Sequence, residues 1–210
     1  MQRLLVMSIL LASTPALAGD LPSTEVSATE LPAKAKPRGS LIKRVLKFTD
    51  KNGTNYIAFS TTSSEKKAPD GARFQTRWLY IDHWAIAQGK APRELLPARD
   101  FVQDCPLDMT ANFVDDAFHL TDLDNDGIAE VTYGYQLACR GDVSPAAYKL
   151  LLVENGTKHI LRGEAKYEIS GLDPMGGTFT PEPEEKKWPA KFYAHAVALW
   201  KTTSRDGLSQ

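Results

Sequence analysis

The sequence lacks an excess of charge of either sign. Its 210 residues carry 25 basic and 26 acidic side chains, which give a formal net charge of -1. Binding nucleic acid through bulk charge requires a basic surplus that displaces counterions from phosphates, so this balance excludes that class of protein. Hydrophobic residues make up 42% and charged residues 24%, an ordinary globular composition that excludes collagen-like and strongly disordered classes.

The sequence also lacks an apolar run of the roughly 20 residues that span a bilayer. A shorter run, Leu4–Ala12, follows the basic Arg3 and precedes the small residues Ala16 and Ala18. This layout is typical of a secretory signal peptide. We therefore predict that residues 1–18 are cleaved near Ala18 and that the mature chain is periplasmic or secreted, without stable membrane insertion. The alternative is a buried N-terminal helix.

Cysteine is scarce, because the chain has only Cys105 and Cys139. In an exported protein such a pair normally forms a disulfide. The bridge is worth roughly 3–4 kcal/mol on the loop-entropy estimate. A nucleophilic cysteine needs a nearby base and a depressed pKa, and the sequence around these two residues supplies neither. We predict a structural disulfide.

The organisation after the signal peptide is that of a single domain. Residues 19–39 are rich in proline, serine, threonine and charge and have no apolar period, which predicts a disordered leader. Residues 40–203 form one β-rich domain, and residues 204–210 are a tail. About 190 residues are enough for one domain with a sizeable core.

Short alternating runs separated by turn signals predict a mainly β fold. The pairs Asn52-Gly53 and Asn155-Gly156 each lie between two such runs and predict tight hairpins. The last apolar residues recur at steps of three and four, as in a helix: Trp188, Phe192, Ala196, Leu199 and Trp200. We predict an α+β architecture, an antiparallel sheet or sandwich of hairpins with a C-terminal helix.

Aromatic side chains form a stripe on one of the predicted strands. The rings fall at even spacing: Phe74, Trp78, Tyr80 and Trp84. Alternate residues of a strand share a face. Two interpretations stay open, a surface that stacks on sugar rings or one face of the β-core. On the first interpretation Trp78 and Tyr80, together with Asp142 of a later loop, are candidate ligand-facing residues.

An acidic loop carries the clearest chemical signal. Residues 122–130 hold carboxylates at positions 1, 3, 5 and 9 of the loop: Asp122, Asp124, Asp126 and Glu130. Gly127, at position 6, permits a sharp turn, and the carbonyl of Ile128 supplies the oxygen of position 7. Calcium takes six to eight hard oxygen ligands, and close carboxylates repel one another without a cation. The loop predicts a calcium site.

The loop departs from the EF-hand pattern at position 12. An EF-hand requires a bidentate glutamate there, and this chain has Tyr133. The flanking segments are β-like rather than helical, so the unit resembles the strand–loop–strand of FG-GAP or integrin-type repeats, present once. One missing carboxylate favours an affinity suited to millimolar extracellular calcium. The alternative is a plain hairpin turn with solvated acids.

A wider resemblance covers residues 100–163. Its motifs are Asp104-Cys105-Pro106-Leu107-Asp108, the acidic loop, Cys139-Arg140-Gly141-Asp142-Val143-Ser144-Pro145 and Leu161-Arg162-Gly163. In this order they are similar to a family of exported bacterial proteins that is labelled surface polysaccharide biosynthesis protein. The resemblance implies a location at the cell envelope and a polysaccharide or another envelope component as partner. It carries over no catalytic residue.

Signals for other chemistry are few. The four histidines have no zinc-ligand spacing, and no nucleophile elbow, phosphate loop or dinucleotide motif occurs. Four carboxylates could serve glycoside cleavage, which needs two acids at a set separation: Asp100, Asp104, Asp108 and Asp142. The sequence therefore favours a non-enzymatic, calcium-stabilised binding or structural domain. An enzyme of envelope or surface polysaccharide metabolism is the alternative.

Overall fold

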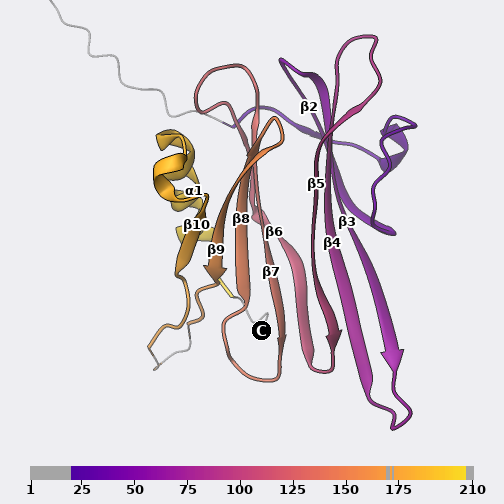
Figure 1. Ribbon diagram of the computed structural model, residues 1–210, viewed down its shortest axis with the longest axis vertical. Coiled ribbons are helices and arrows are strands. Elements are labelled where there is room, and N and C mark those ends of the chain that lie inside the picture. Colours follow the sequence, from indigo (N-terminus) through magenta and orange to yellow (C-terminus); the bar gives the residue numbers. More distant parts are fainter. Residues whose placement is uncertain (1–19, 169–170, 172, 207–210) are drawn as a thin grey trace, which may run out of the picture.

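The protein is a sandwich of two five-stranded antiparallel sheets, as described by a computed structural model for residues 20–168, 171 and 173–206 (Figure 1). In the first sheet the strand order is β1-β2-β3-β4-β5, and in the second it is β10-β9-β8-β7-β6. Within each sheet consecutive strands are neighbours, and the chain passes from the first sheet to the second between β5 and β6. The predicted mainly β architecture with a C-terminal helix is confirmed.

The first sheet contains β1 (Thr24–Glu25), β2 (Leu41–Asp50), β3 (Gly53–Lys67), β4 (Arg73–Ile86) and β5 (Arg93–Cys105). The second contains β6 (Asp108–Thr121), β7 (Glu130–Arg140), β8 (Ala147–Glu154), β9 (Thr157–Glu164) and β10 (Phe179–Glu182). The helical elements are η1 (Ala28–Glu30), η2 (Glu185–Lys187) and α1 (Ala190–Thr203). Because the strands alternate in direction, the β2–β3, β4–β5, β6–β7 and β8–β9 turns gather at one end of the sandwich (Figure 1).

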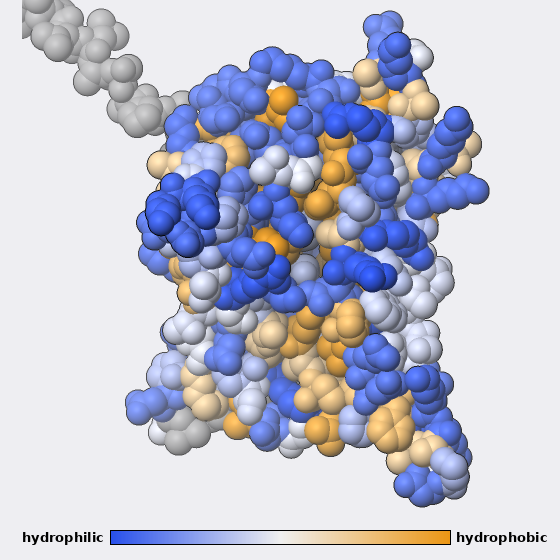
Figure 2. Space-filling model, viewed as in Figure 1, coloured by the Kyte–Doolittle hydropathy of each residue, from blue (hydrophilic) through white to orange (hydrophobic). Residues whose placement is uncertain are grey.

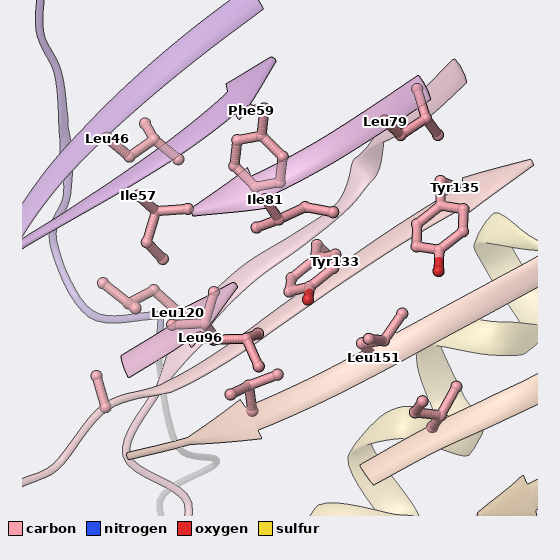
Figure 3. Packing of buried hydrophobic residues seen from close by; sticks show 14 of the residues in the cluster. Leu46, Ile57, Phe59, Leu79, Ile81, Leu96, Leu120, Tyr133, Tyr135 and Leu151 are labelled. Atoms are coloured by element: carbon pink, nitrogen blue, oxygen red, sulfur yellow. The ribbon is translucent and has the colours of Figure 1, made fainter. Parts of the chain in front are cut away.

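The main core lies between the two sheets. On each strand, alternate residues point into this space, as the period of two requires. Figure 3 shows Leu46, Ile57 and Phe59 of the first sheet facing Tyr133 and Leu151 of the second. Figure 2 shows a largely hydrophilic surface on which hydrophobic residues gather in the band between the sheets.

Helix α1 covers the outer face of the second sheet. Its buried side chains Phe192, Ala196 and Trp200 pack against Tyr148 and Leu150 of β8. These are positions of the apolar stripe read from the sequence, so the helical interpretation is confirmed. Pro189 is the N-cap residue, where a missing N–H donor has no cost to the helix.

The segment predicted as a disordered leader packs against the domain from residue 20 onward. It begins beside β6, where the N–H of Leu21 donates to the carbonyl of Leu120 at 2.6 Å, and then crosses the outer face of the first sheet. Ala35 is buried there with Val45 and Trp84, and β1 pairs with β2. Arg38 donates from Nε to Oδ1 of the fully buried Asp82 at 2.6 Å. The segment shields the apolar outer surface of β2–β4 from water. Its polar composition did not predict this packing. The predicted signal peptide, residues 1–18, lies outside the described residues.

The end of the chain is also tied down. Asp206 accepts hydrogen bonds from both terminal nitrogens of Arg140, at 2.6 and 2.9 Å, and from the backbone of Ala146 at 2.8 Å. The predicted tail therefore packs against the domain as far as residue 206, and residues 207–210 lie outside the described part.

Cys105 and Cys139 form the predicted disulfide, with their Cα atoms 5.6 Å apart. Cys105 is the last residue of β5 and Cys139 lies in β7, so the bridge joins the two sheets. The part of the chain that the structure describes contains no helix with the length and apolarity needed to cross a membrane.

Candidate functional site: an acidic loop at the turn end of the sandwich

The acidic loop connects β6 to β7 at the end where the turns gather. Two strands therefore flank it, as the sequence predicted. Gly127 has a φ of 84°, a left-handed conformation that glycine adopts without steric cost, and Asn125 has a φ of 63°. The turn at Gly127 lets the chain bend back so that the loop carboxylates converge.

Backbone N–H groups orient three of the carboxylates. Asp122 Oδ2 accepts from the N–H of Gly127 at 3.0 Å. Asp124 Oδ1 accepts from Asp126 at 3.2 Å, and Asp126 Oδ1 accepts from Ile128 at 2.6 Å. Each aspartate thus uses one oxygen to fix the loop, and its second oxygen is left for another partner. The predicted ligand role of the Ile128 carbonyl stays a prediction.

Glu130, the first residue of β7, is the most deeply placed carboxylate of the loop and has no exposed surface. Both of its oxygens accept from the N–H of Leu123, at 3.1 and 2.8 Å, and Oε2 also accepts from Thr121 Oγ1 at 2.9 Å. Burial raises the pKa of Glu130, and the negative charge of Asp124 adds to the rise. A cation beside Glu130 would favour its charged form.

A fifth carboxylate enters the site from β8. Glu154 lies directly opposite Glu130 in the β7–β8 ladder. Ligand oxygens lie within 4.8 Å of one another in two overlapping groups, Asp122 with Asp124 and Glu130, and Asp124 with Asp126 and Glu154. Burial raises the pKa of Glu154 to about 7, and the surrounding carboxylates, Asp124 first, add to the effect.

Two oxygens of this cluster are buried and unpaired. Asp122 Oδ1 and Glu154 Oε1 have no hydrogen-bond partner among the described residues. An unpaired buried carboxylate oxygen costs its full desolvation energy, roughly 1–3 kcal/mol or more for a charged group. Asp122 belongs to the first of these groups and Glu154 to the second. A divalent cation held by either group would offer a partner to the unpaired carboxylate in it, so the donor set fits a hard metal ion.

Neighbouring elements hold the loop from two sides. Asp50, in the β2–β3 hairpin, accepts from the N–H of Ala129 at 3.2 Å, and the N–H of Lys51 donates to the carbonyl of Gly127 at 2.9 Å. On the other side, Lys191 of α1 donates to the carbonyl of Leu123 at 2.7 Å. The loop geometry therefore depends on the first sheet and the helix as well as on its own sequence.

Sequence reasoning missed Glu154. Glu154 is the last residue of β8 and directly precedes the predicted Asn155-Gly156 turn, which is present with both residues at positive φ. The register that sets Glu154 against Glu130 was not predictable from the turn. Tyr133, which replaces the glutamate of position 12, is buried in the core between the sheets. Position 12 of the loop pattern therefore points into the hydrophobic core, away from the loop carboxylates.

The aromatic stripe lies on the outer face of the first sheet, opposite the face that forms the core. Trp84 is covered by the N-terminal segment. The ring of Trp78 lies 4.2 Å from that of Phe101, and the guanidinium of Arg99 lies 5.5 Å from the Trp78 centroid. Arg38 lies 5.3 Å from the Tyr80 centroid. Trp78 and Tyr80 thus stack on protein groups, which compete with a bound sugar for the same ring faces.

The other candidate carboxylates are engaged in different places. Asp100 accepts from the hydroxyl of Tyr135 at 2.9 Å and pairs with Lys149 between the sheets. Asp104 pairs with Lys66 at 3.2 Å in an exposed position. Asp142 accepts from the N–H of Ser144 at 3.0 Å, the side-chain-to-backbone bond of a local turn.

Asp108 is the exposed first residue of β6. None of the four carboxylates proposed for glycoside cleavage lines the 650 Å³ cavity or the 330 Å³ cavity of the molecule.

Comparison with known proteins found no matching family model, no matching curated protein and no matching solved structure. The family resemblance drawn from the sequence therefore stays a prediction, and the candidate function depends on the geometry of the site.

Proposed function

We propose that this protein is an exported, non-enzymatic binding or structural domain of the bacterial cell envelope, stabilised by calcium and by its disulfide. The observation that supports a metal site is the two buried, unpaired oxygens, Asp122 Oδ1 and Glu154 Oε1, one in each of the two carboxylate groups that share Asp124. The export signal read from the sequence and the disulfide support the location. The proposal that the domain binds a polysaccharide or another envelope component is based on the family resemblance.

Calcium fits this donor set better than magnesium or zinc does. All five side chains offer carboxylate oxygens: Asp122, Asp124, Asp126, Glu130 and Glu154. Calcium accepts six to eight oxygens in flexible geometry, whereas magnesium demands a near-ideal octahedron and zinc favours nitrogen and sulfur. Bound calcium would neutralise the repulsion among these carboxylates and join β8 to the β6–β7 loop. Its role here is structural.

We expect calcium to raise the melting temperature of the mature protein. At a free concentration about 100-fold above the dissociation constant, the gain is roughly 2–3 kcal/mol, or about 5–10 °C for a domain of this size. Thermal melts in calcium and in EGTA, with isothermal calorimetry, measure the effect. Magnesium is expected to give a smaller shift.

Asp124→Asn is the variant of choice, because Asp124 is exposed and its Oδ1 accepts a bond that asparagine preserves. It should lose most of the calcium shift and keep the melting temperature measured in EGTA. Asp116→Asn is the matched control, since Asp116 is an exposed acid outside both carboxylate groups. Equal melting of the wild type in calcium and EGTA, with no calorimetric heat, would refute the metal site.

The location has its own test. Expression of the full chain in a Gram-negative host should yield a periplasmic or secreted product whose N-terminal residue is Gly19. Subcellular fractionation and intact-mass measurement check this expectation. Recovery of the uncleaved chain from the cytoplasm would contradict export without touching the metal site.

A further inference from the structure

A cavity of about 650 Å³ opens between the two sheets, with no residue in common with the acidic loop. Ligand pockets for small molecules measure about 300–1,000 Å³. The cavity has strands β2, β3 and β4 on one side and strands β6 and β7 on the other. Its size and its position inside the sandwich make it a second candidate site.

A large bulge in β6 accompanies this opening. Val114 pairs with Gly134 and His119 pairs with Thr132, so residues 115–118 face Tyr133 alone. A β-bulge bends its strand and redirects side chains, and bulges are frequent near binding sites. Here the bulged segment contributes Asp115 and Phe118 to the cavity lining.

Aromatic rings line the interior of the cavity. Phe59, on β3, lies 5.1 Å from the ring of Phe113, 6.0 Å from that of Phe118 and 5.9 Å from that of Tyr133. All three contacts are edge-to-face, with interplanar angles of 76°, 89° and 78°. Rings at right angles present no flat platform for a sugar, but they form an apolar surface that a flexible hydrocarbon chain can follow.

The charged groups of the lining leave a positive surplus. Arg44 pairs with Glu25 at 3.2 Å. Arg77 donates to the neutral acceptors Ser63 Oγ at 3.1 Å and Asn112 Oδ1 at 3.3 Å, and it has no carboxylate partner among the described residues. Lys43 adds a second such cation and Asp115 one acid. A guanidinium without a carboxylate partner, in a cavity that also holds aromatic rings, is suited to an anionic headgroup.

We propose that this cavity binds a single-chain anionic amphiphile, with the acyl chain against Phe59 and Phe113 and the headgroup at Arg77. Phe118 is left out of the chain site because the guanidinium of Arg44 lies 5.2 Å from its ring centroid. Both a carboxylate and a phosphate can accept two parallel hydrogen bonds from a guanidinium, so a free fatty acid and an alkyl phosphate share the required chemistry. The inference does not depend on calcium. It identifies a lipid-like ligand class, separate from the polysaccharide of the proposed function.

Calorimetric titration with dodecanoate below its micellar concentration, in EGTA, tests the proposal. Dodecyl phosphate distinguishes the two headgroup sources, dodecyl maltoside keeps the chain with a neutral head, and acetate keeps the carboxylate without a chain. We expect dodecanoate or dodecyl phosphate to bind, and the maltoside and acetate to bind at least roughly tenfold more weakly.

Arg77→Gln should weaken binding of the anion roughly tenfold or more and leave that of the maltoside unchanged. Arg73→Gln is the matched control, because Arg73 lies on the same strand, is exposed and does not line the cavity. Ser63→Trp, at an exposed lining position, should block the cavity without disturbing the core.

Several results would overturn the proposal: no binding of either anion to the wild type, equal binding of the maltoside, or equal loss of affinity in Arg73→Gln and Arg77→Gln. A folded Ser63→Trp protein that binds dodecanoate like the wild type would place the ligand elsewhere and also overturn it. Circular dichroism confirms folding of each variant. The calcium-dependent melting shift is measured separately, so failure at this cavity leaves the metal site untouched.

Discussion

Acidification from about pH 7 to about pH 4 is expected to reduce the free energy of unfolding by roughly 3 kcal/mol through His83 alone. His83 is 4% exposed on β4, and its Nε2 lies 2.9 Å from Asn55 Oδ1. Burial, with a contribution from the charge of Arg93, lowers the pKa of His83 to about 3. In the unfolded chain the pKa is about 6.5, so between these values the unfolded state binds a proton that the folded state does not. Stability is lost as the pH falls through this window.

The variant His83→Gln isolates this effect, because glutamine keeps a donor for Asn55 and does not titrate. Urea unfolding at several pH values gives the free energy of unfolding as a function of pH for each protein. The difference between the wild-type and variant slopes gives the contribution of His83. The subtraction is needed because the raised pKa values of Glu130 and Glu154 act in the opposite direction, stabilising the metal-free protein as the pH falls. Parallel pH profiles for the two proteins would contradict the prediction.

Replacement of both cysteines by serine is expected to lower the free energy of unfolding by about 3–4 kcal/mol. The physical reason is that the bridge between Cys105 and Cys139 restricts the unfolded chain, and it also joins the edge strand β5 to the second sheet. Urea unfolding of the double variant Cys105→Ser/Cys139→Ser under oxidising conditions measures the loss.

Reduction supplies the control for the disulfide. Dithiothreitol should destabilise the wild type by a similar amount and should leave the double variant unchanged. If the oxidised wild type and the double variant unfold at the same urea concentration, the disulfide makes no contribution and the loop-entropy argument does not apply to this bridge.

The β architecture followed from local sequence signals. Asn52-Gly53 and Asn155-Gly156 predicted hairpins because only residues that accept positive φ form such tight turns, and both hairpins are present. The C-terminal helix was visible because its buried residues Phe192, Ala196 and Trp200 follow the helical repeat. In each case the signal depends on residues close together in the chain.

The N-terminal segment shows the limit of composition as a guide. Residues 20–39 have the polar character of a disordered leader, yet Ala35 and Arg38 lie against the first sheet. The segment gains its order from the apolar outer face of β2–β4 and from the buried carboxylate of Asp82. Trp84 and Asp82, which it covers, lie more than 40 residues further along the chain. Composition indicates how much apolar surface a segment can bury by itself. It does not indicate whether another part of the fold offers a surface on which the segment can order.

The two Asn-Gly hairpins, the C-terminal helix, the cysteine pair and four acids of the loop were predictable from local sequence, because turn chemistry and residue spacing act over a few neighbouring residues. The folded arrangement was needed to show that Glu154 joins those acids, that Asp50 holds their loop and that a bulge in β6 borders a cavity. Strand register and sheet packing set these relations, since they bring together residues whose separation along the chain carries no signal.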